Sequence, residues 1–125
     1  MFTHVMVGSN DLERSKTFYM ATLGALGLEG MQTPNGGVFF SQGGMAFGVG
    51  TPANGEPACF ANGGTIGFQA TTKEQIDAFH AAGLANGGTD EGLPGVREGA
   101  PGQPYGAYLR DPDGNKICAF AGVQL

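Results

Sequence analysis

The chain has 125 residues, of which 41% are hydrophobic and 14% charged, and its formal net charge is −5. This length fits one domain with a proper core, whereas six scattered Lys and Arg residues do not form the cationic cluster of a nucleic-acid-binding surface. No apolar stretch approaches the roughly 18 residues of a membrane helix, and the N-terminus lacks the basic-then-apolar order of a signal peptide. The two cysteines form neither a CxxC motif nor a disulfide framework, so we expect a reducing cytoplasm.

The first half of the chain predicts a strand, a helix and three more strands. Alternation over residues 2–8 places Val5 on one face of a strand and His4 on the other. Asn10, with Glu13 three residues later, indicates an approximate capping box at the start of a helix. Glycine-rich turns then separate three short predicted strands, over residues 28–33, 37–42 and 45–50.

The second half predicts the same order of elements. Residues 51–63 are rich in Gly, Pro and Asn and form a linker without periodicity. A strand over residues 65–70 follows, and Thr71, with Glu74 three residues later, predicts the start of a second helix. The remaining predicted elements are a weak strand near 88–92 and a hairpin of strands 105–110 and 116–121 around the turn Asp111-Pro112-Asp113-Gly114-Asn115.

A shift of 61 residues superposes the two halves without gaps. Val5 then lies on Ile66, and Phe18 lies on Phe79. Neither half can bury its sheet face alone, so the halves must share one core. We therefore predict an α+β protein of two βαβββ modules that form one curved mixed sheet, with the helices outside and a cavity between the halves. The predicted organisation is a single domain, with module 1 at 1–50, the linker at 51–63 and module 2 at 64–125.

Three segments carry a family resemblance over nearly the whole chain: HVMVGSNDLERSKTFY at the start, AFHAAGLANGGTDEG in the second half and YLRDPDGNKI near the end. With the βαβββ repeat, they resemble the vicinal oxygen chelate superfamily, which includes glyoxalase I, bleomycin-resistance proteins and extradiol dioxygenases. The middle segment is similar to a glyoxalase-like branch of bacterial proteins. The resemblance implies the glyoxalase/bleomycin-resistance/dioxygenase fold and a homodimer.

In the metal-using members of that superfamily, the first and last strands of each module supply the ligands of a divalent ion. Position by position, only His4 is a matching ligand. Thr65 stands where a second His is expected, Cys118 stands where the pattern DPDGNxxE has Glu, and the fourth position falls near Phe47 or Gly48. These residue types do not suit Mg²⁺, Mn²⁺ or an open Zn²⁺ site. We therefore expect no metal and no other cofactor, with Zn²⁺, Ni²⁺ or Mn²⁺ at His4 as the alternative.

The resulting hypothesis is a protein that binds a small organic molecule in a mostly apolar cavity. His4 is the candidate catalytic residue, for proton transfer, if the protein is an enzyme. Lactoylglutathione lyase-like or other metal-dependent lyase or dioxygenase chemistry is the alternative. The predicted ligand-binding residues are Phe47, Thr65, Tyr105, Tyr108, Arg110 and Cys118.

Two of these site residues, Arg110 and Cys118, also have simpler interpretations. Arg110 beside a turn often pairs with a local carboxylate, here Asp111 or Asp113. Cys118 also suits a small core position, because free cysteine is among the most buried residue types. His80, on the second predicted helix, is expected at the surface.

Overall fold

The computed structural model describes residues 1–125 and contains two helices and eight strands. Their order confirms the predicted βαβββ repeat, and residues 51–65 contain no helix or strand. The elements are β1 (His4–Gly8), α1 (Leu12–Ala25), β2 (Gly30–Gln32), β3 (Val38–Gln42), β4 (Met45–Gly50), β5 (Ile66–Gln69), α2 (Lys73–Ala85), β6 (Thr89–Val96), β7 (Tyr105–Arg110) and β8 (Lys116–Ala121).

The strands form two four-stranded sheets of matching topology. Sheet A has the order β1-β4-β3-β2, and sheet B has the order β5-β8-β7-β6. In each sheet the first strand of the module pairs in parallel with the last, and the other pairs are antiparallel. The α+β class is confirmed. The prediction of one continuous sheet is wrong, because β1 and β5 are edge strands that pair only within their own modules.

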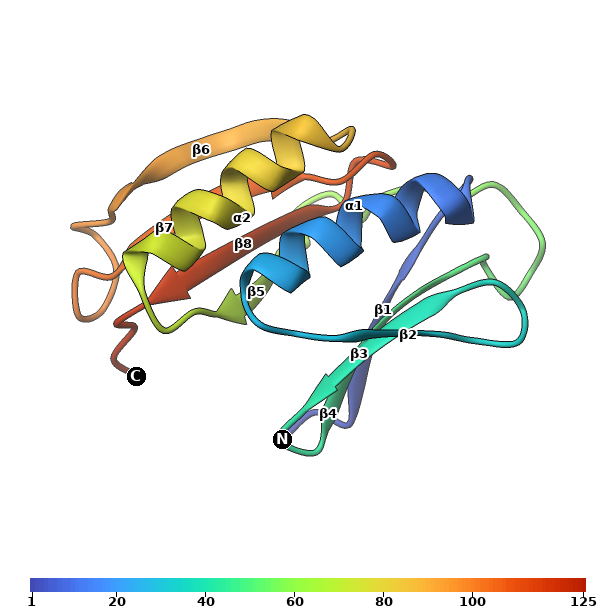
Figure 1. Cartoon of the computed structure of the whole chain (residues 1–125), viewed down its shortest axis with the longest axis horizontal. Coiled ribbons are helices and arrows are strands. Elements are labelled where there is room, and N and C mark those ends of the chain that lie inside the picture. Colours follow the sequence, from blue (N-terminus) through green and yellow to red (C-terminus); the bar gives the residue numbers. More distant parts are fainter.

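The two helices pack against each other and cover one face of the sheets (Figure 1). A single core of 15 buried residues therefore spans both modules, as the repeat predicted. We call the other face of each sheet, which no helix covers, its outer face. The core consists of Phe18, Tyr19, Leu23, Leu26, Val38, Phe40, Phe47, Val49, Ala70, Ile76, Phe79, Ala107, Leu109, Ile117 and Ala119.

Both helices begin one residue later than the sequence indicated. Asp11, not Asn10, caps α1, and its side chain accepts from the backbone N–H of Arg14. The amide side chain of Asn10 instead exchanges two hydrogen bonds with the backbone of Ala58. A side chain held by the linker in this way does not cap the helix.

Helix α2 shows the same one-residue shift. Thr72, not Thr71, is its N-cap, and Gln75 completes a full capping box. The side-chain oxygen of Gln75 also accepts from the backbone N–H of Thr71, so both threonines are tied to the first turn. Capping boxes stabilise a helix start by satisfying two backbone donors reciprocally.

The turn before β8 joins module 2 to the first helix of module 1. The Asp111 carboxylate accepts from the Tyr19 hydroxyl at 2.6 Å and from the Asn115 side chain at 2.8 Å. Burial, together with the neighbouring Asp111 carboxylate, raises the pKa of Tyr19 well above its usual value. The phenol therefore stays protonated and remains a hydrogen-bond donor in the core.

The second carboxylate of this turn, Asp113, lies at the N-terminus of α1. It accepts from the backbone N–H of Asn10 at 3.0 Å and from the Ser15 hydroxyl at 3.1 Å, and it pairs with Arg14 at 3.1 Å. A carboxylate is favourable at this end of a helix because it satisfies free N–H groups and complements the helix dipole.

Strand β6 departs from the sequence-based expectation. It runs to Val96, past the predicted end at Gly92, with two register shifts against β7. His80 is not at the surface as predicted. It is 4% exposed, and its Nε2 lies 2.8 Å from Asp90 Oδ1 on β6. An imidazole facing a carboxylate explains how a polar residue is accommodated where α2 meets the sheet.

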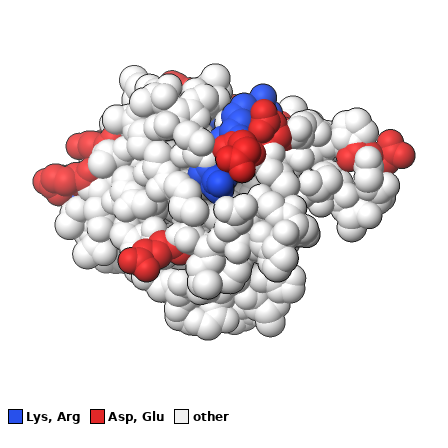
Figure 2. Space-filling model, turned by 45° about the vertical axis from the view of Figure 1, so that its right-hand side comes forward, with Lys and Arg blue, Asp and Glu red and all other residues white.

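Charged side chains are sparse on the molecule. On the face shown in Figure 2, Lys, Arg, Asp and Glu occupy a few separate places and most of the surface carries no charge. Neither helix has the length and hydropathy needed to cross a membrane.

Candidate functional site

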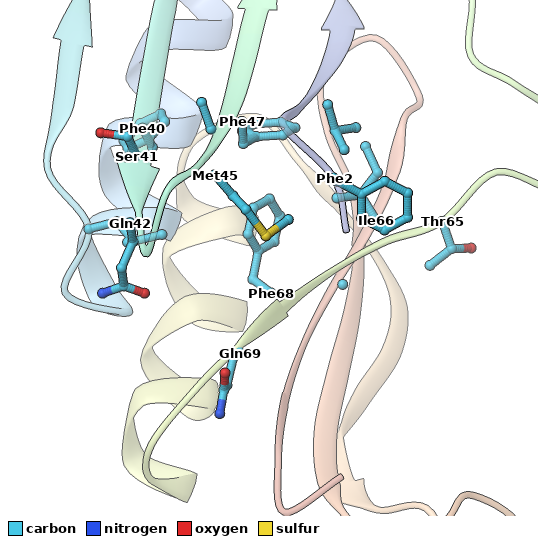
Figure 3. A pocket seen from close by; sticks show the side chains of 14 residues that line it. Phe2, Phe40, Ser41, Gln42, Met45, Phe47, Thr65, Ile66, Phe68 and Gln69 are labelled. Atoms are coloured by element: carbon cyan, nitrogen blue, oxygen red, sulfur yellow. The ribbon is translucent and has the colours of Figure 1, made fainter. Parts of the chain in front are cut away.

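A cleft with a volume of about 400 Å³ lies between the two modules (Figure 3). It opens between β1, β3 and β4 of sheet A and β5 of sheet B. Nine of its 14 lining residues are hydrophobic, and none carries an ionisable side chain. The lining residues are Phe2, Val5, Leu28, Phe40, Ser41, Gln42, Met45, Ala46, Phe47, Thr65, Ile66, Gly67, Phe68 and Gln69.

Strand alternation explains why the interior of the cleft is apolar. On β5, Ile66 and Phe68 point to the helix-covered side and pack against the core. The rings of Phe47 and Phe68 meet edge to face across the two sheets, with centroids 5.0 Å apart. Figure 3 shows the Met45 side chain reaching toward Phe68 from the end of the β3–β4 hairpin.

The polar side chains lie at the margin of the cleft. In Figure 3, Gln42, Gln69 and Thr65 project from its edges rather than into its centre. Such a distribution offers an apolar floor for a flat or aliphatic group and a few hydrogen-bonding groups that orient it.

Of the predicted site residues, the structure brings only Phe47 and Thr65 into this cleft. His4 lies outside it, on the outer face of sheet A, contrary to the expectation of a shared cavity. Its Nδ1 is 2.9 Å from the Thr3 hydroxyl, and it lines a separate hollow of about 350 Å³ with Met6. The predicted alternation of β1 holds, but the cleft forms on the other side of the strand, where Val5 points.

Tyr108, Arg110 and Cys118 lie together on the outer face of sheet B. Tyr108 is the direct cross-strand partner of Cys118, and Arg110 pairs in register with Lys116. Cys118 is buried, as its simpler interpretation predicted, but it does not line the cleft. Burial raises the pKa of the Cys118 thiol to about 11, so it is protonated and not a ready nucleophile at neutral pH.

Arg110 and Tyr105 have partners that the sequence did not suggest. Arg110 pairs with Glu91 at 2.7 Å and donates to the Gly114 carbonyl, so its expected pairing with a carboxylate of the turn is wrong. Tyr105 points to the helix side, and its hydroxyl donates to Asp77 at 2.6 Å. This hydrogen bond raises the pKa of Tyr105. Tyr105 and Tyr108 therefore point to opposite faces of sheet B.

The structure also locates the fourth position of the implied metal site. Met6 pairs with Gly48, and Gly67 pairs with Cys118. Because Met6 and Gly67 are equivalent in the 61-residue repeat, Gly48 corresponds to Cys118. A side chain at position 48 would overlap the Met6 thioether, which covers this place.

The donor set therefore does not fit the divalent metal of the superfamily. The four equivalent positions offer one imidazole, one hydroxyl, one protonated thiol and no side chain at Gly48. The chain contains no group of three or more His, Cys, Asp or Glu residues arranged to hold a metal ion. Hard cations require several oxygen ligands, and none of these positions supplies a carboxylate.

Sequence reasoning missed most of the residues that line the cleft, including Phe2, Met45 and Phe68. The alternation of β5 contained the necessary signal, since it placed Ile66 and Phe68 together on the face opposite Thr65. The contribution of Phe2 and Met45 depends on how the two modules meet, which no local pattern records.

Comparisons with known proteins agree with this architecture. A family model described as the Glyoxalase/Bleomycin resistance protein/Dioxygenase superfamily matches residues 1–119. The chain belongs to that superfamily. None of the curated proteins matches it.

Several solved structures are similar to the chain over nearly its full length. The crystal structure of a glyoxalase/bleomycin resistance protein from Albidiferax ferrireducens T118 is 55% identical, with a TM-score of 0.88 and coverage of 97% of this chain and 98% of that one. A lactoylglutathione lyase from Agrobacterium tumefaciens is 25% identical, with a TM-score of 0.64 and coverage of 98% and 93%. A putative glyoxalase from Bacillus halodurans is 24% identical, with a TM-score of 0.75 and coverage of 97% and 95%.

Proposed function

We propose that the protein binds a small, uncharged organic molecule in the cleft between its modules, without a catalytic metal. The observation that carries this proposal is the lining, which is predominantly hydrophobic and contains no ionisable side chain. The volume of about 400 Å³ lies within the range of ligand pockets, roughly 300–1,000 Å³. An ion placed there would lose its hydration without gaining a partner, so the cleft selects for neutral molecules.

The relatives support a binding function of this kind. The 55% identical protein is described as a glyoxalase/bleomycin resistance protein. Bleomycin-resistance proteins, as the resemblance implies, sequester a small molecule without metal catalysis. The poor donor set of this chain agrees with that mode.

The test is a titration of ¹⁵N-labelled protein with p-cresol, an aromatic molecule that is neutral at pH 7. We expect its largest amide shifts in β5 and at the end of the β3–β4 hairpin. Met45→Trp fills the mouth of the cleft and should weaken binding at least tenfold. Leu84→Trp is the matched control, because Leu84 is 48% exposed, Met45 is 41% exposed, and Leu84 lies on α2 away from the cleft. Equal binding by the two variants, or shifts centred elsewhere, would refute the proposal.

We also propose that the chain forms a homodimer. Support comes from the outer face of sheet A, where Met6, Gly48, Phe39 and Met31 form a row across the strands and both methionines are exposed. A second copy of the chain would remove this apolar row from water. Light scattering after size-exclusion chromatography should give twice the chain mass of 12.8 kDa, and Met31→Lys should shift it toward the monomer. A wild-type monomer at high concentration would disprove the dimer.

A metal-dependent lyase or dioxygenase is the second candidate. The retained His4 and the 25% identical lactoylglutathione lyase favour it. His4 is exposed and would transfer protons as the catalytic residue. Metal analysis of the purified protein, with melting curves before and after EDTA and with Zn²⁺, Ni²⁺ or Mn²⁺, separates the candidates. Stoichiometric metal and a melting shift on chelation would support the enzyme; neither result is expected from the binding protein.

A further inference from the structure

A row of four aromatic rings runs from the core into the cleft between the modules. Phe18 and Tyr19 of α1 meet edge to face, with ring centroids 4.9 Å apart. The Tyr19 ring lies 5.1 Å from the ring of Phe47 on β4, and Phe47 meets Phe68 of β5 edge to face at 5.0 Å. All three separations lie in the range at which aromatic rings attract one another. The row therefore crosses from module 1 to module 2.

The rings become more exposed along the row. Phe18 and Tyr19 are fully buried, and Phe47 is 6% exposed. Phe68, the last ring, is half-buried and lines the cleft. Among the ring pairs of the structure, Phe68 takes part only in the one with Phe47. The row thus ends at a ring that has one aromatic neighbour and faces a hollow in which it can accept another.

The surroundings of Phe68 also suit an aromatic ring. The Met45 side chain reaches toward Phe68 (Figure 3), and it is 41% exposed. A thioether is polarizable, makes favourable contacts with aromatic rings, and adapts its rotamer to the group beside it. Phe2, from the segment before β1, brings a further ring to the same cleft.

Buried area alone does not distinguish an aromatic ligand from a saturated one. The gain from removing apolar surface from water depends on the area, so two neutral rings of equal size gain about the same. Ring–ring and sulfur–ring contacts come in addition to this term, and only an aromatic ligand makes them. The end of the row at Phe68 therefore decides which of the two the cleft prefers.

We propose that the cleft selects neutral aromatic molecules, and that the ring of the ligand extends the row by contacting Phe68 beside Met45. This inference rests on the proposed function and names the class of molecule that the cleft takes. The additional contacts should make an aromatic ligand bind about three- to tenfold more tightly than its saturated analogue.

The test compares p-cresol with trans-4-methylcyclohexanol. Both are uncharged at pH 7, and both carry a methyl and a hydroxyl group at opposite positions of a six-membered ring. Titrations into ¹⁵N-labelled protein give the two Kd values, and p-cresol should bind about three- to tenfold more tightly. Phe68→Leu keeps the position apolar but removes the last ring, so it should bring the ratio of the two Kd values close to one.

The matched control is Phe60→Leu, which removes a ring outside the cleft. Phe60 is 47% exposed, its ring centroid lies 5.3 Å from the Arg110 guanidinium carbon, and it does not line the cleft. This variant should keep the wild-type ratio of the two Kd values. The wild-type comparison requires no substitution, so it tests the inference even if Phe68→Leu is unstable.

The possible failures are distinguishable. Equal binding of the two ligands in the cleft would overturn this inference and leave the proposed function standing. A preference for p-cresol that persists in Phe68→Leu would also overturn it, because the preference would then come from the more acidic phenol hydroxyl and not from the rings. If neither ligand shifts amides of β5 or the β3–β4 hairpin, both the inference and the proposed function are wrong.

Discussion

Replacing Asp113 by alanine should destabilise the protein strongly, although the residue lies in a turn. Its side chain is only 1% exposed and receives three hydrogen bonds, from the Asn10 backbone, the Ser15 hydroxyl and the Arg14 guanidinium. Asp113→Ala leaves the first turn of α1 without these partners. It also cuts a link between the last hairpin of module 2 and the first helix of module 1.

The expected loss follows from the exposure of each partner. A hydrogen bond to a charged group contributes about 1.5–3 kcal/mol. The contribution of Arg14 is discounted because its side chain is 44% exposed and the pair is screened by solvent. We therefore expect a loss of about 2–4 kcal/mol in the free energy of unfolding. With an unfolding entropy of about 2.1 cal/mol/K per residue, this corresponds to a fall in Tm of about 8–15 °C.

Thermal unfolding followed by circular dichroism measures this loss. The control is Glu13→Ala, which removes an acidic side chain from the same helical turn. Glu13 is 78% exposed and pairs only with Lys16, at 3.3 Å. We expect this control to cost at most about 1 kcal/mol, or about 4 °C. If Asp113→Ala lowers Tm by no more than Glu13→Ala, the buried carboxylate is not a major link between the modules and the reasoning is wrong.

Three further predictions concern single residues. A disulfide-exchange reagent at pH 8 should modify the exposed Cys59 quickly and the buried Cys118 only after unfolding, and two fast thiols would contradict the raised pKa of Cys118. The hydrogen bond from His80 lowers the pKa of Asp90 from its usual 3.8, so its stabilisation is present above pH 3.8 and is lost as pH falls through the lower folded-state value. The free energies of unfolding of the wild type and Asp90→Asn, measured against pH, should therefore converge below pH 3.8. A difference in free energy that stays constant down to the lowest pH would exclude this origin. Gly106→Ala should cost about 1–3 kcal/mol in denaturant unfolding, since the new methyl group displaces an aromatic ring, and an unchanged midpoint would show that the ring moves freely.

The sequence predicted the architecture because each module repeats the same local signals. The apolar alternation of β1 and β5, the turn glycines and the 61-residue shift all depend on neighbours in the chain, and the structure confirms the order of elements. The exact helix starts were missed for a non-local reason. The side chain of Asn10 is a good cap in isolation, but it is bound to Ala58, which is 48 residues away.

The candidate site was harder to predict for the same reason. The sequence correctly placed His4 and Val5 on opposite faces of β1. The cleft, however, forms on the face of Val5, where the two modules meet. His80 was misplaced because its partner, Asp90, lies on a strand whose length and register depend on β7. Thr65 lines the cleft although His4, its equivalent in the repeat, does not, so the repeat alone does not decide which residues reach the cleft.

The turn that carries Asp113 also governs the order in which the protein can be completed during synthesis. The N-terminus of α1 is synthesised before this turn, so Asn10 must wait for a carboxylate 103 residues further on. Within module 1, β1 likewise has no partner until β4 has been made. A fold closed by such distant contacts has a high contact order and is expected to fold slowly. The first module therefore remains unfinished until the last hairpin arrives.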